Sequence, residues 1–368
     1  MNEKTQPCTH CGVVQPRVNL TWMGSAELCP ECLQRYTVCC DCCGERIWMA
    51  NDYGTHYLHL CASCRADNYV TCENCGALIP QEDAHYNDED KAYCDNCYER
   101  GYGGTIHNYS YKPEPIFYGD GPLYLGVELE VDEAGKDNIN AVQALRAFNQ
   151  ENVYGYVKSD GSLNDGFELV THPCTLETHL QQVPWRETLE ALRGMGYRSH
   201  APGTCGLHVH VSRKALGKDV YEQEETIAKL LYIFERFWQE ILRFSRRTES
   251  QINHWAARYG YKDRGEEILK EAKHGANGRY ACINLTNTDT IEFRVFRGTL
   301  KYNTVIATLQ FVANLCRVAI SLPEYRIQEF SWPALIEALT QDNCPELVQY
   351  LKERNLYVNE PVTAEREV

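Results

Sequence analysis

Three stretches of the chain alternate between apolar and polar residues, and their polar residues are of types that hold metal ions and phosphate. The stretches are LYLGVELEVD at 123–132, GLHVHVS at 206–212 and TIEFRVFRG at 290–298. Successive side chains of a strand point to opposite faces, so each stretch predicts a strand with one apolar and one polar face. The polar faces carry Glu128, Glu130 and Asp132, then His208, His210 and Ser212, and finally Glu292 and Arg294.

If these strands lie in one sheet, their polar residues meet in a single concavity. Carboxylates, imidazoles and a guanidinium in one place suit hard divalent cations together with phosphate groups. We therefore expect an enzyme. Each pattern alone has a simpler explanation, because Glu-x-Glu and His-x-His also occur on solvated strand faces. Glu292 and Arg294 could likewise form only an ion pair.

The composition narrows the class of protein. A length of 368 residues with 43% apolar content predicts two or three domains with a real core. No run approaches the roughly 18 to 20 apolar residues of a membrane span, and the start MNEKTQPC has no apolar signal region. We expect a cytoplasmic protein without a membrane segment. The net charge of -15 disfavours a protein that coats nucleic acid, although it allows a local basic patch.

The cysteines form an internal repeat. Fourteen of the nineteen precede residue 98, mostly as CxxC pairs. Three of these pairs begin at positions 8, 40 and 72, each 32 residues after the last and each followed by glycine. Their partner pairs keep this period to within one residue. In a chain without a secretion signal, such spacing favours an array of metal-binding modules in a reducing compartment.

Each repeat supplies four thiolates as CxxC, a spacer of 17 or 18 residues and a second CxxC. This pattern predicts tetrahedral structural zinc. The three ligand sets are Cys8, Cys11, Cys29 and Cys32; Cys40, Cys43, Cys61 and Cys64; and Cys72, Cys75, Cys94 and Cys97. We expect three zinc ions in three treble-clef or LIM-like zinc-ribbon modules, at about residues 1–37, 38–70 and 71–103.

Two details of the modules leave alternatives. Cys39 and Cys42 form a competing CxxC one residue out of register, but the repeat and Gly44 favour Cys40 and Cys43. Four histidines could replace a sulfur, although four cysteines in every module make surface positions the simpler interpretation. These histidines are His10, His56, His59 and His85.

The modules are acidic. Residues 1–103 contain 15 Asp and Glu against 7 Lys and Arg, a balance of −8. A surface of this charge is a poor binder of phosphate backbones, so nucleic acid is not the expected partner. The charge favours a module that docks a protein partner or attracts amines, and a merely solvated surface remains the alternative.

The rest of the chain predicts a linker and a second domain. Residues 104–122 are rich in Gly, Tyr and Pro and lack periodicity, which is typical of a linker. From 123 to 368, strands separated by short loops precede long helices, and the chain ends in helical patterns. This order predicts an α+β domain with an antiparallel or mixed sheet and helices on one face.

The order of motifs in this domain resembles a known family. GVELEVD, KSDGSL, FELVTHP, CGLHVHVS, RYACINL and TIEFRVFRGTL follow one another as in the amidoligase branch of the glutamine synthetase-like carboxylate–amine ligases. The resemblance covers roughly residues 122–322 and leaves the cysteine modules outside. It implies a glutamine synthetase-like fold. The branch is frequent in bacteriophage genomes, and for a phage protein the location would be the host cytoplasm.

What the resemblance implies is ATP-dependent amide formation. A carboxylate takes the terminal phosphoryl group of ATP to give an acyl phosphate, and an amine then displaces phosphate. Such chemistry needs magnesium or manganese to neutralise the triphosphate, and cations that steady the phosphoryl oxygens. The substrates would be a carboxylate and an amine, on small molecules, on a peptide, on a protein or on a modified base. No stretch resembles a glutaminase, so the amine would be free or carried by a partner.

The resemblance also assigns roles to residues. The implied magnesium ligands are Glu128, Glu130, Glu168, His208 and Glu292, with His208 and Glu292 on the ion nearer ATP and Glu168 also receiving the amine. The implied catalytic residues are Arg294 on the transferred phosphate, His210 in contact with phosphate, and Glu168. Lys158 is an implied ATP anchor, and Arg279 and Arg297 are implied anchors for phosphate or the acid substrate.

Two other classes of function were weighed against a ligase. One is a zinc-ribbon adaptor whose C-terminal domain binds nucleotide or metal without turnover, and ATP consumption with candidate amines would separate the two. The other is a zinc protein that binds nucleic acid, which the acidic ribbons disfavour.

Overall fold

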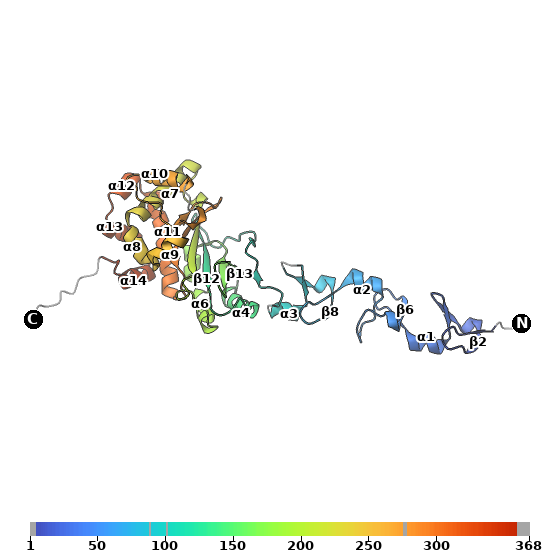
Figure 1. Cartoon of the computed structure of the whole chain (residues 1–368). Coiled ribbons are helices and arrows are strands. Elements are labelled where there is room, and N and C mark those ends of the chain that lie inside the picture. The colour runs from blue at the N-terminus through green and yellow to red at the C-terminus, as the bar shows by residue number, and fades with distance from the viewer. Residues whose placement is uncertain (1–4, 88–89, 101, 275–277, 359–368) are drawn as a thin grey trace, which may run out of the picture. The chain divides into compact units, whose positions relative to one another are not determined.

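The computed structural model describes residues 5–87, 90–100, 102–274 and 278–358. The chain divides into two compact units, Met1–Gly104 and Thr105–Val368. Figure 1 shows the elements of both, with the N-terminal unit in blue and cyan. Each unit has its own buried cluster or clusters, so each is described by itself.

The N-terminal unit repeats one small module three times, and each module begins with a hairpin around the first CxxC pair. The glycine after each pair, Gly12, Gly44 and Gly76, has a φ of 74°, 75° and 72°. Glycine reaches this left-handed conformation without the penalty that a Cβ would bring, so it permits the tight turn. The second CxxC pair of each module opens a short helix.

The elements of the N-terminal unit are short. The strands are β1 Thr5–Pro7, β2 Val14–Pro16, β3 Thr21–Met23, β4 Ala26–Leu28, β5 Thr37–Cys39, β6 Arg46–Trp48, β7 Tyr69–Thr71, β8 Leu78–Pro80, β9 His85–Tyr86 and β10 Ala92–Tyr93. The helices are α1 Pro30–Tyr36, α2 Ala62–Asn68 and α3 Asp95–Glu99, and the 3₁₀ turns are η1 Arg17–Asn19, η2 Met49–Asn51 and η3 Gln81–Asp83.

The buried residues of the modules are mostly cysteines. The third module, for example, buries only Cys72, Ile79, Tyr93 and Cys97 in its cluster. A core of this size gives little hydrophobic stabilisation, and domains below about 40 residues usually need a metal or disulfides. The modules therefore depend on what their cysteines bind.

The C-terminal unit is built on one eight-stranded mixed sheet in the order β11-β13-β14-β12-β16-β18-β17, with β15 also paired to β12. The strands are β11 Ile106–His107, β12 Tyr124–Val131, β13 Gly155–Lys158, β14 Phe167–Thr171, β15 Cys174–Thr175, β16 Gly206–Ser212, β17 Ile283–Asn284 and β18 Thr290–Arg297. All pairings are antiparallel except β11 with β13, which is parallel. The predicted α+β class with a mixed sheet is confirmed.

The apolar face of the sheet belongs to one continuous core with the helices. On β12, Leu125, Val127, Leu129 and Val131 are all fully buried. The ring of Phe234 in α7 lies 5.7 Å from the ring of Phe293 in β18, which shows how the helices pack on this face. Burial of each Leu or Val side chain contributes about 1.5–3 kcal/mol, so the alternation in the sequence fixes which face turns inward.

Eleven helices are described in the C-terminal unit (Figure 1). They are α4 Asn138–Phe148, α5 Leu176–Gln181, α6 Trp185–Gly194, α7 Val220–Arg236, α8 Trp238–Ser245, α9 Glu249–Trp255, α10 Gly265–His274, α11 Tyr302–Ser321, α12 Glu324–Gln328, α13 Trp332–Leu339 and α14 Pro345–Glu353, with 3₁₀ turns η4 Arg213–Ala215 and η5 Gly278–Tyr280.

Helix α11 bears on the expectation that the chain has no membrane segment. It is the single helix among the described residues that is long and apolar enough to cross a membrane, with a mean hydropathy of 1.5 over its best window. However, 83% of that window is buried inside the C-terminal unit, where α11 packs against α7, α13 and α14. Its apolar composition is thus accounted for by the core of this unit.

The predicted linker is corrected in part. Residues 104–122 were expected to lie outside the domains, but Ile106 and His107 form β11 and pair with Val157 and Lys158 of β13. A two-residue edge strand has too little alternation to be recognised in a sequence rich in Gly, Tyr and Pro. The sheet of the C-terminal unit therefore begins well before residue 123.

We predict that a buried histidine makes the C-terminal unit sensitive to acid. His179 in α5 bonds the carbonyl oxygen of Leu125, and burial lowers its pKa from 6.5 to about 4. The unfolded chain takes up this proton below about pH 6.5 and the folded chain only near pH 4. The contribution of His179 to the free energy of unfolding is therefore complete above pH 6.5. Between pH 6.5 and 4 it falls by at most about 1.4 kcal/mol per pH unit.

Urea unfolding is monitored by circular dichroism at 222 nm, which reports mainly on helices of the C-terminal unit. The midpoint urea concentration is compared across the pH range. His179→Gln should make the urea midpoint less dependent on pH between 6.5 and 4. Arg193→Gln, an exposed control, should leave this dependence unchanged. An unchanged slope in the His179 variant would show that other groups cause the sensitivity.

Candidate active site and zinc centres

The cysteines of each module converge on one point. In every module the four predicted sulfurs lie within 4.8 Å of one another. Measured pairs are Cys11 to Cys29 at 3.7 Å, Cys43 to Cys61 at 3.9 Å and Cys75 to Cys94 at 3.8 Å. Tetrahedral zinc with Zn–S bonds of about 2.3 Å requires sulfurs about 3.8 Å apart. The donor sets and spacing fit three zinc sites.

Backbone N–H groups lower the pKa of one cysteine thiol in each module and so favour the thiolate that binds metal. Burial opposes ionisation of Cys8, but the N–H groups of Cys11, Cys29 and His10 outweigh it and lower the pKa of Cys8 to about 6. The equivalent Cys40 also has a pKa of about 6, mainly through the N–H groups of Cys61 and its own loop. A thiolate is the form that binds zinc, so the turn geometry favours metal binding at neutral pH.

The structure separates the cysteines that compete for the second site. Cys40 and Cys43 join Cys61 and Cys64 in the cluster, whereas Cys39 is exposed on β5. Cys42 is also exposed, and its sulfur accepts a hydrogen bond from Asn68 at 3.6 Å.

The four histidines of the modules do not enter the ligand groups formed by the described residues. His59 and His85 each contact a carboxylate, of Asp52 and Asp95 respectively. His10 lies 3.9 Å from the sulfur of Cys32, and His56 packs edge-on against Tyr57. Their positions match the expectation of surface histidines beside complete sets of cysteines.

We predict that Cys40→Ser loses one zinc ion and Cys39→Ser loses none. Cys40 is buried within the cluster, while Cys39 points out of it. The measurement is zinc per chain by atomic emission, with three expected for the unmodified protein. A structural zinc contributes on the order of 10 kcal/mol to a small module, so Cys40→Ser should also unfold the second module. Equal zinc contents in the two variants would contradict the assignment.

A second cluster lies on the polar face of the eight-stranded sheet, where Glu128 is the central residue. Its Oε2 lies 3.3 Å from Nδ1 of His208, and its Oε1 lies 3.2 Å from Nε2 of His210. The pairing register places Glu128 opposite His208, and His210 opposite Glu292. Nδ1 of His208 lies 3.6 Å from Oε1 of Glu292. Glu128 thus shares one small volume with residues 80 and 164 positions further along the chain.

Two groups of ligand atoms within this cluster could each hold an ion. One group contains Glu128, His210 and Glu292, and the other contains Glu128, Glu168 and His208. The atoms of each group lie within 4.8 Å of one another, and Glu128 is common to both. Carboxylate oxygen and imidazole nitrogen are suitable ligands for magnesium or manganese, so the donor chemistry fits two adjacent divalent cations.

The protein itself balances part of the charge on these carboxylates. Burial opposes ionisation of Glu128, but His210 and His208 hold the pKa of this carboxyl well below its ordinary value. Burial likewise opposes ionisation of Glu292, and His210 again lowers its pKa. The pKa of His210 is raised, because Glu128 outweighs burial.

Glu168 has the opposite environment. It lies opposite Glu130 on β12 and Lys158 on β13, and Nζ of Lys158 is 3.3 Å from its Oε2. Burial and the nearby charge of Glu128 raise the pKa of Glu168 well above its ordinary value, although Lys158 opposes this. Two neighbouring carboxyl groups are thus shifted in opposite directions, which is a common arrangement where one binds cations and the other exchanges a proton.

Glu130 marks the other end of the cluster. Its Oε2 accepts a hydrogen bond from the N–H of Gly206, and its Oε1 is 4.0 Å from Nδ1 of His208. Burial raises the pKa of Glu130. Glycine is required at position 206, because a Cβ would collide with the ring of His208 and approach Nη2 of Arg247 to 3.0 Å. Glu130 is not part of either three-residue ligand group.

Arg294 and Glu292 form the ion pair that the sequence left open as an alternative. Nη1 of Arg294 donates to Oε1 of Glu292, and this carboxylate raises the pKa of Arg294 against the effect of burial. Glu292 also accepts a hydrogen bond from Asn284 at 2.8 Å. Nε of Arg294 is buried and has no hydrogen-bond partner among the described residues. The pair lies inside the cluster, so it does not exclude a role in phosphate binding.

A tyrosine from the predicted linker lies over the site. The ring of Tyr109 is 5.6 Å from Nζ of Lys158, and its hydroxyl accepts a hydrogen bond from Arg279. Arg279 also donates to the hydroxyl of Tyr280 at 2.9 Å. Through Tyr109, Lys158 of β13 is thus linked to Arg279 of η5, the turn that precedes β17.

The expected site residues therefore divide into two sets. The structure brings together Glu128, Glu130, Glu168, Lys158, His208, His210, Glu292 and Arg294. Arg279 contacts Tyr109, and the buried Nε of Arg297 has no hydrogen-bond partner among the described residues. The sequence interpretation missed Asn284, Tyr109 and Arg247. A signal for the last was available, since Arg246 and Arg247 form a dibasic pair directly after a helical pattern.

One protein-family model matches part of the C-terminal unit. Residues 146–316 match the protein-family model described as "Putative amidoligase enzyme". The match confirms the resemblance to amidoligases over that part of the chain and supports a ligase that forms amide bonds. It includes His208, His210, Glu292 and Arg294, whereas β12 with Glu128 precedes it.

One solved structure similar to the chain is a bifunctional glutathione synthetase from Pasteurella multocida. The identity is 15%, the match covers 63% of this chain and 46% of that chain, and the TM-score is 0.31. The match thus spans less than half the length of that protein, and at this TM-score the likeness carries no argument. No curated protein matches the chain.

We predict that Glu128→Gln weakens cation binding more than any other single amide substitution in the cluster. Glu128 belongs to both ligand groups, so one change removes an anionic ligand from each. Manganese binding, followed by electron paramagnetic resonance, should weaken by more than the roughly 10- to 100-fold that loss of an outer partner costs. Glu190→Gln, an exposed change in α6, is the matched control.

The fold should persist in Glu128→Gln, because the apolar contacts of β12 belong to the other face of the sheet. Normal manganese affinity in a folded Glu128→Gln protein would show that this carboxylate is not a ligand.

Proposed function

We propose that the protein is an ATP-dependent carboxylate–amine ligase with a glutamine synthetase-like catalytic domain, which forms an amide through an acyl phosphate. The observation that carries the proposal is the pair of ligand groups that share Glu128 and lie beside Arg294. Divalent cations held there would neutralise the triphosphate of ATP and the phosphoryl group in transfer. The family match over residues 146–316 supports the amide-forming class.

In this proposal, each side chain has a defined task. Arg294 and His210 lie at the end of the cluster near Glu292, where they steady the oxygens of the transferred phosphoryl group. The carboxylate of the acid attacks the terminal phosphorus, and ADP leaves. Arg294 is well suited, because its unpartnered Nε and buried position leave donors for a phosphoryl oxygen.

The second half-reaction needs a base. The amine attacks the acyl carbon, phosphate leaves, and the amine must give up a proton. Glu168 has a raised pKa and a position beside Glu128, which suits a carboxylate that accepts this proton near neutral pH. Lys158, whose Nζ lies 3.3 Å from Glu168, stabilises the carboxylate form of Glu168 that accepts the proton. The ammonium group of Lys158 can also anchor ATP before the first step.

The zinc modules serve recruitment in this proposal. They carry no cluster of the catalytic kind among the described residues, and residues 1–103 have a balance of −8. An acidic, metal-stabilised array is suited to hold a basic protein partner or a substrate-bearing peptide near the catalytic unit.

We predict ADP and phosphate as products, because His210 and Arg294 lie at the carboxylate cluster, where they would stabilise transfer of the terminal phosphoryl group. The assay uses ATP labelled at its terminal and first phosphates, with magnesium, hydroxylamine and a library of carboxylic acids. Hydroxylamine should trap the activated acid as a hydroxamate, with ADP formed in equal amount. Glu128→Gln provides the background rate.

Three outcomes separate the candidate functions. Stoichiometric ADP and hydroxamate support the ligase. AMP as the main nucleotide would refute an acyl phosphate, since it would mean attack at the first phosphate. ATP binding without any acid-dependent turnover across the library would favour the adaptor.

A further inference from the structure

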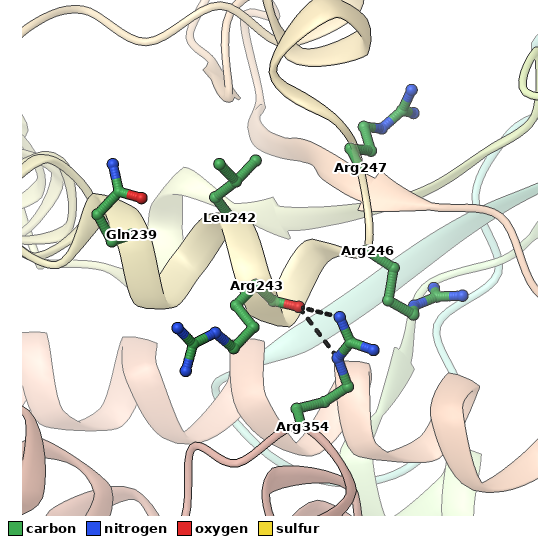
Figure 2. A pocket seen from close by; sticks show the side chains of 6 residues that line it. All are labelled: Gln239, Leu242, Arg243, Arg246, Arg247 and Arg354. Atoms are coloured by element: carbon green, nitrogen blue, oxygen red, sulfur yellow. Dashed lines mark hydrogen bonds between the residues drawn. The ribbon is translucent and has the colours of Figure 1, made fainter.

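Four arginines gather at the C-terminal end of α8 and line a pocket of about 250 Å³. They are Arg243, Arg246, Arg247 and Arg354, joined by Gln239 and Leu242. Figure 2 shows Arg246 and Arg247 leaving the end of the helix while Arg354 reaches the same turn from below. The chain as a whole has a net charge of -15, so this concentration of positive charge is a local feature of the pocket.

These arginines have no carboxylate partner within 4.0 Å among the residues that the structure describes. Backbone carbonyl groups hold them instead. Arg354 donates to the carbonyl of Arg243 at 2.9 and 3.1 Å, and Arg246 donates to the carbonyls of Arg297 and Gly298. Such bonds fix the positions of the guanidinium groups but leave their charges unbalanced.

Capping of the helix explains only part of this cluster. Cations near the last turn of a helix are stabilised by its carbonyl groups, and the bonds of Arg354 are of this kind. Arg247 is different, because it is 94% buried and bonds a single carbonyl, that of Phe296, at 3.3 Å. Its Nε and Nη1 are buried without a hydrogen-bond partner. A buried guanidinium with unused donors usually belongs to an anion site.

The chain pays a conformational cost to present these residues. Arg246 adopts a left-handed conformation with a φ of 65°, which is unfavourable for a residue with a side chain. Burial together with neighbouring arginines lowers the pKa of Arg247 to about 10, although Glu130 opposes this. The lowered pKa of Arg247 fits a positive charge that the nearby groups of the protein do not fully balance.

The pocket adjoins one end of the carboxylate cluster. Nη2 of Arg247 is among the atoms nearest to Gly206, and the N–H of Gly206 bonds Glu130. His210 lies opposite Gly126, four residues along β12 from Glu130. Side chains nevertheless connect the two ends of the cluster, because Nδ1 of His208 lies 4.0 Å from Oε1 of Glu130 and 3.6 Å from Oε1 of Glu292.

We propose that Arg243, Arg246, Arg247 and Arg354 form an anion-binding pocket that holds a phosphate or carboxylate group of the acid substrate, distinct from the carboxylate that reacts. The assignment to the acid substrate rests on the proposed ligase function, whereas anion binding does not. The acid would then be at least a dianion, with its second charge in the pocket. Its reactive carboxylate would extend past Glu130 toward Glu292 and Arg294, where the phosphoryl group is transferred.

The test uses the full, zinc-loaded chain without magnesium and measures binding by calorimetry. Inorganic phosphate and succinate are the probes for the two chemistries. Arg247→Gln and Arg243→Gln should each weaken binding roughly tenfold or more, since each removes a charge-assisted hydrogen bond. Arg243 is exposed, so its variant keeps the fold even if the buried change does not. Arg193→Gln, an exposed arginine of α6, is the matched control and should bind as the unmodified protein does.

A second arm separates the two sources of the anion. ADP is added with magnesium, and phosphate or succinate binding is measured again. Binding that persists supports a pocket for the acid substrate, whereas displacement by ADP would assign the pocket to the nucleotide and overturn that part of the proposal. Equal affinities in all variants, or no binding of either probe, would overturn the anion pocket itself. None of these readouts needs turnover, so a failed ligase assay and a failed pocket remain distinguishable.

Discussion

The repulsion between carboxylates on the polar sheet face is the constraint on which the site depends. Glu128, Glu130, Glu168 and Glu292 lie within one buried volume, and each loses hydration there. Such a cluster folds only because imidazole, ammonium and guanidinium groups stand among the carboxylates and because cations can join them. The apolar face of the same strands provides the packing energy that keeps the charged face in place.

The positive groups compensate the carboxylates unequally, so the carboxylates differ in their protonation. Glu128 between two histidines is held in the ionised form, while Glu168, next to Glu128, is pushed toward the protonated form despite Lys158. Beyond Glu130 the balance reverses, and arginines outnumber acids. In our proposal, one face of the sheet combines a proton-exchanging carboxyl, a cation site and an anion pocket, which an acid, ATP and an amine meeting in one place would need.

The zinc modules solve a different physical problem. A module of about 32 residues cannot bury enough apolar surface to fold alone, and its cluster consists largely of the cysteines themselves. Metal bonds replace the missing core. Because the stabilisation is local, the array can vary its surface freely, which is consistent with the acidic faces that we assign to partner recruitment.

The sequence by itself determined the features that depend on local periodicity. Alternation identified β12, β16 and β18, and the 32-residue cysteine repeat identified the zinc ligands, because both patterns are set by geometry within a few residues. Tertiary structure alone decided which distant residues meet. It placed Ile106 in the sheet through a two-residue pairing and brought Arg247 beside Glu130, although 117 positions separate them in the chain. Such contacts arise from strand order and helix packing, which no short pattern encodes.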